Sequence, residues 1–301
     1  MDAVERTVSL KEIEKNIRYL PFLPTILSEL MMMDKDDDYY YEKLLKLAKQ
    51  DPPLTTFILR IANSAIAAPL KDIQTLEMAL ARIGTQTVVR ALASMGVARV
   101  FIPLTEGHKA LWWHSIETGV ISRLIAKQCP HLDIKPDFAY ICGLLHDIGR
   151  FVLLEFNTSA LDETDTMGWD TPKELVENEK SLMGYDHAEV GYMACNHWRL
   201  PKTICNAVRA HHMYDIIKSS KAPHGFKNLV VIIQFADYIS VMMQKHQDWH
   251  EWTDKYLVEF IERNCYWSVW SEMDFSIRDI VPLLKLAKED IDKMAKVVGV
   301  N

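Results

Sequence analysis

Ile141-Cys-Gly-Leu-Leu-His146-Asp147-Ile-Gly-Arg150 is an apolar stretch that carries a histidine and an aspartate side by side. A buried carboxylate costs several kcal/mol unless a cation or strong hydrogen bonds meet it, and histidine with aspartate suits a divalent transition metal. Neighbouring side chains on a helix point about 100° apart, so His146 and Asp147 can share an ion only if it lies over the seam between them. Because two ligands hold a metal weakly, the stretch predicts further ligands elsewhere in the chain.

Length and composition predict an ordinary globular protein. The chain has 301 residues, of which 49% are hydrophobic and 25% charged, so we expect one large domain or two. The formal net charge of -7 argues against general nucleic-acid binding, which depends on clustered lysine and arginine. The cysteines are scattered without C-x-x-C spacing, which predicts reduced thiols in an intracellular protein. They are Cys129, Cys142, Cys195, Cys205 and Cys265.

No targeting or membrane segment is expected. The first ten residues are charged and lack an apolar core, so we predict no signal peptide. The longest apolar run, residues 229–243, is interrupted by Gln234 and Asp237 and is shorter than a membrane span. We therefore expect a cytoplasmic protein without membrane contact.

Apolar residues recur at helical spacing in nearly every segment, and no segment alternates as a strand does, so the sequence predicts an all-α fold. Helices are expected over residues 8–19, 25–33, 41–49, 54–63, 76–83, 85–100, 109–128, 137–156, 171–180, 188–198, 202–212 and 228–244, with a further helical region at the end. Residues 157–168 are polar and are expected to form a loop. The segment Ile102-Pro103-Leu104 is the expected boundary between an N-terminal helical bundle, residues 1–103, and a metal-binding helical domain, residues 104–301, on which the bundle packs.

Further metal-type residues lie on separate predicted helices. They are His114, His187, His211, His212 and Asp237. Taken singly, each has an ordinary structural interpretation, such as a packed histidine or, for Asp237, a salt bridge to Arg90 or Arg209. Together with His146 and Asp147 they follow the order H…HD…H…HH…D. An ionised Asp237 in an apolar helix needs a cation, so the set predicts one shared metal centre.

This order resembles the HD superfamily of metal-dependent phosphohydrolases. Short motifs in the first half are Leu20-Pro21-x-Leu23-Pro24, Asp51-Pro52, Leu59-Arg60-Ile61-Ala62-Asn63-Ser64-Ala65 and Ala79-x-x-x-Ile83-Gly84. The second half adds Gly184-x-Asp186-His187-Ala188-Glu189-Val190-Gly191 and Trp198-x-Leu200-Pro201. Over roughly residues 20–239 the chain is thus similar to an HDOD domain protein. The resemblance implies a bacterial signalling protein with an all-helical fold and one or two divalent ions, such as iron, manganese or zinc.

The resemblance also assigns roles to residues. It implies that His114, His146, Asp147 and Asp237 are the core metal ligands, and that His187, His211 and His212 are the additional ligands of two-metal members such as the HD-GYP phosphodiesterases. Asp147 would bridge the two ions, and Arg150 would stabilise charge on a phosphoryl group. Asp147 and Arg150 are therefore the candidate catalytic residues.

The chain departs from the active HD-GYP pattern and leaves its function open. Arg150 stands in place of a lysine, Ala110 in place of a glutamate, and no Gly-Tyr-Pro follows His211-His212. These departures favour a regulatory signalling protein that retains the metal site and binds a protein partner. The alternatives are a phosphohydrolase acting on a nucleotide or cyclic nucleotide, and a di-iron oxygenase. A metal sealed from solvent would favour the regulatory protein, and a cleft lined by lysine or arginine would favour the phosphohydrolase.

Overall fold

The computed structural model describes residues 8–20, 39–50, 55, 58–59, 61–63, 73–101, 105–264, 276–298 and 300. Within these ranges every regular element is a helix, which confirms the predicted all-α class. The expected helix over residues 25–33, the boundary segment 102–104, the proline motifs near residues 21 and 51, and Cys265 lie outside the described residues. The expected helix over residues 54–63 is described only in part.

The described helices fall into three successive parts of the chain. In the first third they are α1 (Leu10–Ile17), α3 (Tyr40–Gln50), α5 (Leu76–Ile83) and α6 (Thr85–Val100). The central part holds α7 (Glu106–Gln128), α8 (Pro136–Leu145), α9 (Ile148–Phe156), α10 (Thr158–Met167), α11 (Pro172–Met183), α12 (His187–His197) and α13 (Lys202–Ala210). The chain continues through α14 (His224–Lys245), α15 (Asp254–Asn264) and α16 (Ile277–Val298).

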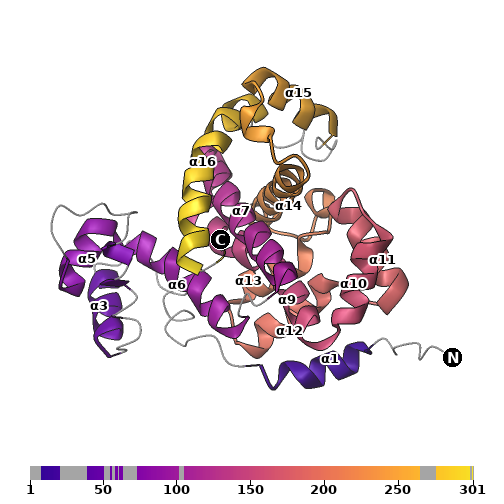
Figure 1. Cartoon of the computed structure of the whole chain (residues 1–301), viewed down its shortest axis with the longest axis horizontal. Helices are drawn as coiled ribbons and strands as arrows, with labels where there is room; N and C mark the ends of the chain where they lie inside the picture. Colours follow the sequence, from indigo (N-terminus) through magenta and orange to yellow (C-terminus); the bar gives the residue numbers. More distant parts are fainter. Residues whose placement is uncertain are drawn as a thin grey trace.

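Two long helices, α7 and α14, form the centre of the molecule (Figure 1). Helices α8 and α16 both pack against α7, and α12 packs on α9 and α13. Helices α10 and α11 form a hairpin at one side, while α3 and α5 project at the opposite side, joined to the main body by α6 (Figure 1). Helix α1 runs beneath the main body against α12.

Glycines allow the helices around the site to approach closely. A Cβ atom on Gly143 of α8 would lie 2.8 Å from the Thr118 carbonyl oxygen of α7, closer than side chains tolerate. A Cβ atom on Gly149, at the start of α9, would overlap the carbonyl of His187 at the start of α12. The first contact holds α8 against α7, and the second brings the start of α9 to the start of α12, which places Asp147 beside His187.

The single helix expected over residues 137–156 is wrong, because the chain breaks at His146-Asp147. Asp147 has φ of -96° and ψ of 17°, outside the helical values, and α9 begins only at Ile148. A continuous helix would direct the two side chains about 100° apart. The break lets both point inward.

The loop expected over residues 157–168 is also wrong, since Thr158–Met167 forms helix α10. Its threonines satisfy their hydroxyls locally, because Thr158, Thr164 and Thr166 each donate a hydrogen bond to the carbonyl four residues earlier. Leu161 and Thr164 are buried, and most of the other side chains are exposed. The polar sequence therefore reflects an amphipathic surface helix that ends at Gly168, where φ is +76°.

Helix α14 is longer than its apolar run suggested. Its 22 residues are long and apolar enough to cross a membrane, which corrects the expectation of too short a segment. However, 89% of its most apolar window is buried inside the protein, as in the core helix of a soluble protein. Its apolar character is therefore explained by its central position between the other helices.

Candidate metal centre

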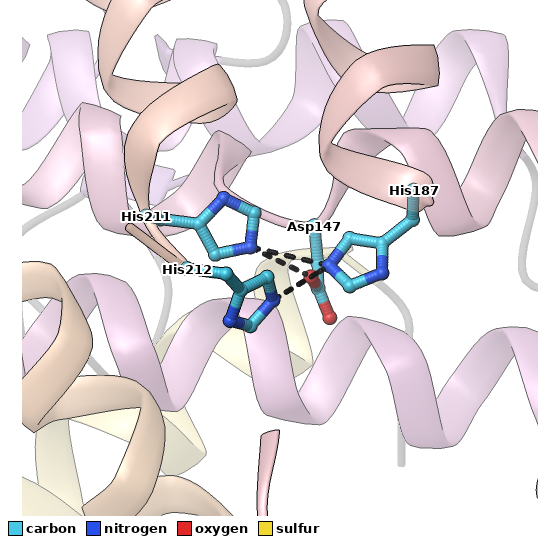
Figure 2. A group of neighbouring side chains, drawn as sticks. All are labelled: Asp147, His187, His211 and His212. Atoms are coloured by element: carbon cyan, nitrogen blue, oxygen red, sulfur yellow. Dashed lines mark hydrogen bonds and ion pairs between the residues drawn. The ribbon is translucent and has the colours of Figure 1, made fainter. Parts of the chain in front are cut away.

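The seven residues predicted as metal ligands converge in two neighbouring groups. Asp147, His187, His211 and His212 form the first group, shown in Figure 2, and His114, His146 and Asp237 form the second. Within each group the ligand atoms lie within 4.8 Å of one another. The residues come from α7, the α8–α9 junction, the start of α12, the segment directly after α13, and α14. All are buried except His212, which is partly exposed.

In the first group the Nε2 atoms of three histidines face one carboxylate (Figure 2). The Oδ1 atom of Asp147 lies 3.0 Å from Nε2 of His187 and 3.6 Å from Nε2 of His211. The His187 Nε2 atom is 3.2 Å from its counterpart in His211 and 2.9 Å from that in His212. The four side chains therefore surround one small space.

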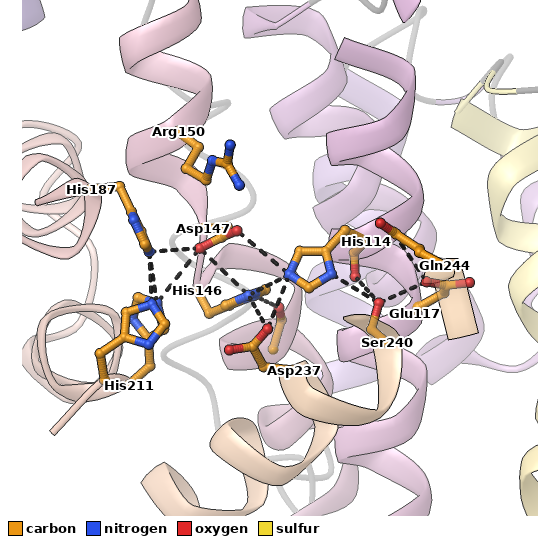
Figure 3. Close-up of polar contacts among 12 residues, drawn as sticks. His114, Glu117, His146, Asp147, Arg150, His187, His211, Asp237, Ser240 and Gln244 are labelled. Carbon is orange, nitrogen blue, oxygen red and sulfur yellow. Dashed lines mark hydrogen bonds and ion pairs between the residues drawn. The ribbon is translucent and has the colours of Figure 1, made fainter. Parts of the chain in front are cut away.

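The second group meets the first at Asp147 (Figure 3). Nε2 of His114 lies 3.1 Å from Nε2 of His146 and 3.3 Å from Oδ1 of Asp237. Asp147 contributes to this group too, because its Oδ2 atom is 3.5 Å from Nε2 of His114 and its Oδ1 atom is 3.6 Å from Nε2 of His146. Asp147 thus lies between the two groups, the position that a bridging carboxylate requires.

Each of the five histidines is held from behind through its Nδ1 atom, so that Nε2 points into the cluster. The Nδ1 partners are Ser240 Oγ for His114 (2.9 Å), the Gly143 carbonyl for His146 (2.7 Å), Glu179 Oε2 for His187 (2.6 Å), the Val208 carbonyl for His211 (2.5 Å) and Tyr214 Oη for His212 (3.0 Å). A carbonyl or carboxylate oxygen can only accept, so Nδ1 of His146, His187 and His211 carries the proton. Their neutral rings then present a lone pair at Nε2, which is the arrangement that supports metal ligands in proteins.

The facing Nε2 lone pairs fit a metal better than a hydrogen-bonded cluster. Two Nε2 lone pairs, such as those of His187 and His211, repel each other when no proton or cation lies between them. An imidazole nitrogen binds zinc at about 2.0–2.1 Å, which places adjacent ligand atoms roughly 2.9–3.4 Å apart in tetrahedral or octahedral geometry. The observed nitrogen–nitrogen distances of 2.9–3.2 Å match the edges of such a polyhedron. The residues present therefore fit divalent metal ions.

The salt bridges considered for Asp237 do not form. Arg90 donates to Asp137 at 2.7 Å, and the guanidinium of Arg209 lies over the Tyr192 ring, 4.9 Å from its centroid. Among the described residues, the ion-pair partners of Asp237 are the histidines of its own group. Its carboxylate is therefore left to balance a cation within the cluster.

The electrostatic field of the cluster favours positive charge. Burial alone would lower the pKa of His187, but the carboxylates of Glu179 and Asp147 outweigh burial and raise that pKa well above its usual value. Burial alone would raise the pKa of Asp147, yet His146 and His187 hold it well below its usual range. In contrast, burial lowers the pKa of the His146 ring to about 4. Metal ions could bind both carboxylates while the histidine rings stay neutral, which would balance the negative charge of the cluster.

The supporting residues were not found from the sequence. Glu179 of α11 is fully buried and accepts from both the backbone N–H and Nδ1 of His187, at 2.9 and 2.6 Å. Ser240 donates to Glu117 at 2.7 Å and so accepts from His114 (Figure 3). Ser240 lies one helical turn after Asp237, a spacing that could have indicated it, whereas Glu179 is joined to His187 only through the turn after α11.

The cluster is not sealed from solvent. A cavity of about 320 Å³ reaches His114, Asp147, His212 and Asp237. The side chain of Arg150 also lines this cavity, as expected, but one of its terminal nitrogens donates to both carboxylate oxygens of Asp165, at 2.8 and 3.1 Å. The only lysine or arginine among the described lining residues is therefore already paired with a carboxylate.

The chain matches a known protein family, and its fold is similar to those of solved structures. The HDOD domain family matches residues 20–214. The structure of an HDOD domain protein of unknown function from Geobacter sulfurreducens is 22% identical and has a TM-score of 0.72, with 97% of this chain and 96% of that chain covered. A structure from Shewanella amazonensis SB2B, named as a proposed phosphohydrolase, is 21% identical with a TM-score of 0.69, over 95% of this chain and 97% of the other. At these identities the likeness shows the fold alone.

One curated relative is longer than this chain. An uncharacterized protein of Treponema pallidum is 28% identical over 220 residues, which is 72% of this chain and 41% of the relative. The chain therefore spans about two fifths of that relative's length.

Proposed function

The chain belongs to the HDOD domain family, and from this premise we propose that it binds two divalent metal ions and hydrolyses a phosphate ester in the adjoining cavity. One observation carries the proposal: five histidine Nε2 atoms and two carboxylates converge at ligand spacing, and the cluster opens to a cavity large enough for a small molecule. A closed cluster would have favoured a purely structural role. The structure of a Shewanella amazonensis SB2B protein named as a proposed metal-dependent phosphohydrolase, 17% identical with a TM-score of 0.52, supports the same class of chemistry.

The ligand sets divide the cluster between two ions. His187, His211 and His212 would hold one ion, His114, His146 and Asp237 the other, and Asp147 would reach both. When bound, such a pair of ions supplies Lewis-acid activation of water and of the phosphoryl group. Iron, manganese, zinc and similar ions all accept imidazole and carboxylate ligands.

The remaining residues orient this machinery. Glu179 and Ser240 fix the rings of His187 and His114 through their Nδ1 atoms, which keeps both Nε2 atoms directed at the cluster. Arg150 uses one terminal nitrogen on Asp165, and a guanidinium has further N–H donors. We assign those donors to the phosphoryl oxygens of the substrate.

A regulatory role is the second candidate function, and the Arg150–Asp165 pair favours it. An arginine fixed by a carboxylate is less free to hold a phosphoryl group, and no other lysine or arginine is found among the described lining residues. In that case the metal ions would be structural, and the chain would act through a signalling protein partner. A related Marinobacter aquaeolei VT8 structure, 16% identical with a TM-score of 0.70, is named as a proposed signal transduction protein.

We also propose a cytoplasmic location. The four cysteines within the described residues are buried and free, as in a reducing compartment.

Metal analysis followed by an activity screen tests the proposal. Protein purified without chelators or a nickel column should contain close to two divalent ions per chain. With manganese or iron present it should release phosphate from at least one phosphomonoester, phosphodiester or nucleotide, and Asp147→Ala should abolish that release. Equal rates in the two proteins would indicate a contaminant and contradict the proposal. Two bound ions without any turnover would favour the regulatory role.

A further inference from the structure

The cavity beyond the metal-ligand cluster has its own charge pattern. We call this part the outer cavity and define it by Leu111, Leu154, Leu161, Asp162, Asp165, Trp169, Pro172, Leu175 and Val241. Arg150 is paired with Asp165, so these two charges largely cancel. Asp162 is exposed on α10, and no described residue forms an ion pair with it, so the outer cavity keeps an excess negative charge.

The inner end of the cavity has the opposite charge once metal is bound. Two divalent ions bring four positive charges, and three of them are cancelled by the carboxylates of Asp147, Asp237 and Glu179, the last hydrogen-bonded to His187. The five histidines are neutral when they bind metal. One positive charge therefore remains, and a single phosphate monoester of about -1.5 to -2 at neutral pH more than balances it. A second anionic group on the same molecule would find no cation at the inner end.

The walls between these two ends are mainly apolar. Four leucines, a proline, a valine and the Trp169 ring line the outer cavity, and they come from α7, α9, α10, α11, α14 and the α10–α11 connection. Such walls exclude water and bind apolar groups. In this environment the charge of Asp162 acts on a bound molecule with less screening than in bulk water.

We propose that the site takes phosphate monoesters of apolar alcohols or phenols that carry no second negative charge, and that it prefers those bearing an amine. This specificity rests on the proposed metal-dependent function. It excludes bisphosphates, nucleoside polyphosphates and cyclic dinucleotides from good binding. In the reaction, water adds to phosphorus, the bond from phosphorus to the alcohol oxygen breaks, and that oxygen takes a proton from the water. No oxidant or further reactant is needed.

Binding of three matched phosphonates tests the charge selection without requiring turnover. Phenylphosphonate, 4-(aminomethyl)phenylphosphonate and 4-carboxyphenylphosphonate differ mainly in the charge placed in the outer cavity. Calorimetry on the manganese-loaded chain should give the tightest Kd for the amine and the weakest for the carboxylate. Equal Kd values, or no binding of any of the three, would overturn the inference. The tightest binding for the carboxylate would overturn it as well, and would indicate that Arg150 leaves Asp165 to hold the ligand.

A charge variant with a matched control locates the effect. Asp162→Asn should reduce the ratio of the carboxylate Kd to the phenylphosphonate Kd by at least about five-fold, the size expected for one close charge in bulk water. Glu163→Gln removes the same charge from the next residue of α10, which is exposed but does not line the cavity, so it should change this ratio little. Equal changes in the two variants would show an effect of net charge alone and refute the inference.

The phosphonate series separates this inference from the proposed function. If the chain binds metal and shows the predicted order of Kd values but hydrolyses nothing, the charge selection holds and the proposed enzymatic function is wrong. If the chain hydrolyses phosphate esters but binds the carboxylate most tightly, the enzymatic function holds and the charge selection is wrong. Metal content measured on each variant confirms that both comparisons concern the same loaded site.

Discussion

Replacing Glu179 with glutamine should weaken one metal ion of the pair and spare the other. Glu179 is fully buried in α11, and one of its oxygens accepts two hydrogen bonds from His187. Glutamine can keep one or both of these bonds through its carbonyl oxygen but removes the negative charge behind the ring. The other carboxylate oxygen has no partner among the described residues, so the new amide group would be a buried donor without an acceptor.

The expected loss follows from this geometry. Changes to residues that support metal-binding histidines typically cost 10- to 100-fold in affinity, about 1.4–2.8 kcal/mol. Only the ion held by His187, His211 and His212 depends on this support, because His114 and His146 are held by Ser240 and the Gly143 carbonyl. At limiting metal, Glu179→Gln should therefore lower the content from two ions towards one.

Metal titration with a chelating indicator measures the two affinities separately. Glu177→Gln is the matched control, since Glu177 lies on the same helix but is exposed and only pairs with Lys173 at 3.8 Å. The control should keep both ions. If Glu179→Gln kept both affinities, or lost both equally, the division of ligands into two groups would be wrong.

Three further predictions concern single residues. Asp237→Ala should lower the metal content of the second group, and a variant that keeps all its metal would reject Asp237 as a ligand. Arg150→Ala should reduce turnover roughly 10²–10³-fold, the scale for loss of one transition-state charge donor, with unchanged metal content; unchanged turnover would remove Arg150 from the catalytic residues. Burial raises the pKa of Glu117 from 4.5 to about 7, so in the metal-stripped protein its contribution to stability is present below about pH 4.5 and is lost as the pH rises through about 7. Glu117→Gln should therefore gain about 3 kcal/mol of unfolding free energy relative to the parent between these pH values, measured by urea denaturation, and parallel curves for the two proteins would contradict this.

The sequence indicated the helical class and the seven candidate ligands because both depend on local patterns. Apolar spacing marks a helix directly, and a buried Asp237 or the His146-Asp147 pair stands out in an apolar segment. The sequence did not show which of these ligands lie close together in space. The family resemblance, and not residue spacing, suggested which histidines share an ion, and the structure now places them in two groups around Asp147.

The parts that the sequence did not reveal depend on tertiary contacts. Polar residues 157–168 were expected to be a loop because a helix with a narrow buried stripe has weak periodicity, and only packing on the rest of the protein shows that stripe. The Arg150–Asp165 pair joins α9 to this same helix, so it could not be anticipated once the helix was missed. Glu179 looked like one more charge on a polar helix until its burial against His187 was visible.

The break at His146-Asp147 explains why the fold and the candidate site depend on the same few residues. An uninterrupted helix through this segment would separate the two side chains, and a larger residue at position 149 would push α12 and His187 away from Asp147. The break directs His146 and Asp147 inward, and Gly149 lets α12 bring His187 to the same carboxylate. Because Asp147 contacts both groups, loss of its carboxylate should weaken both ions, whereas loss of the Glu179 carboxylate should weaken only the ion held by His187.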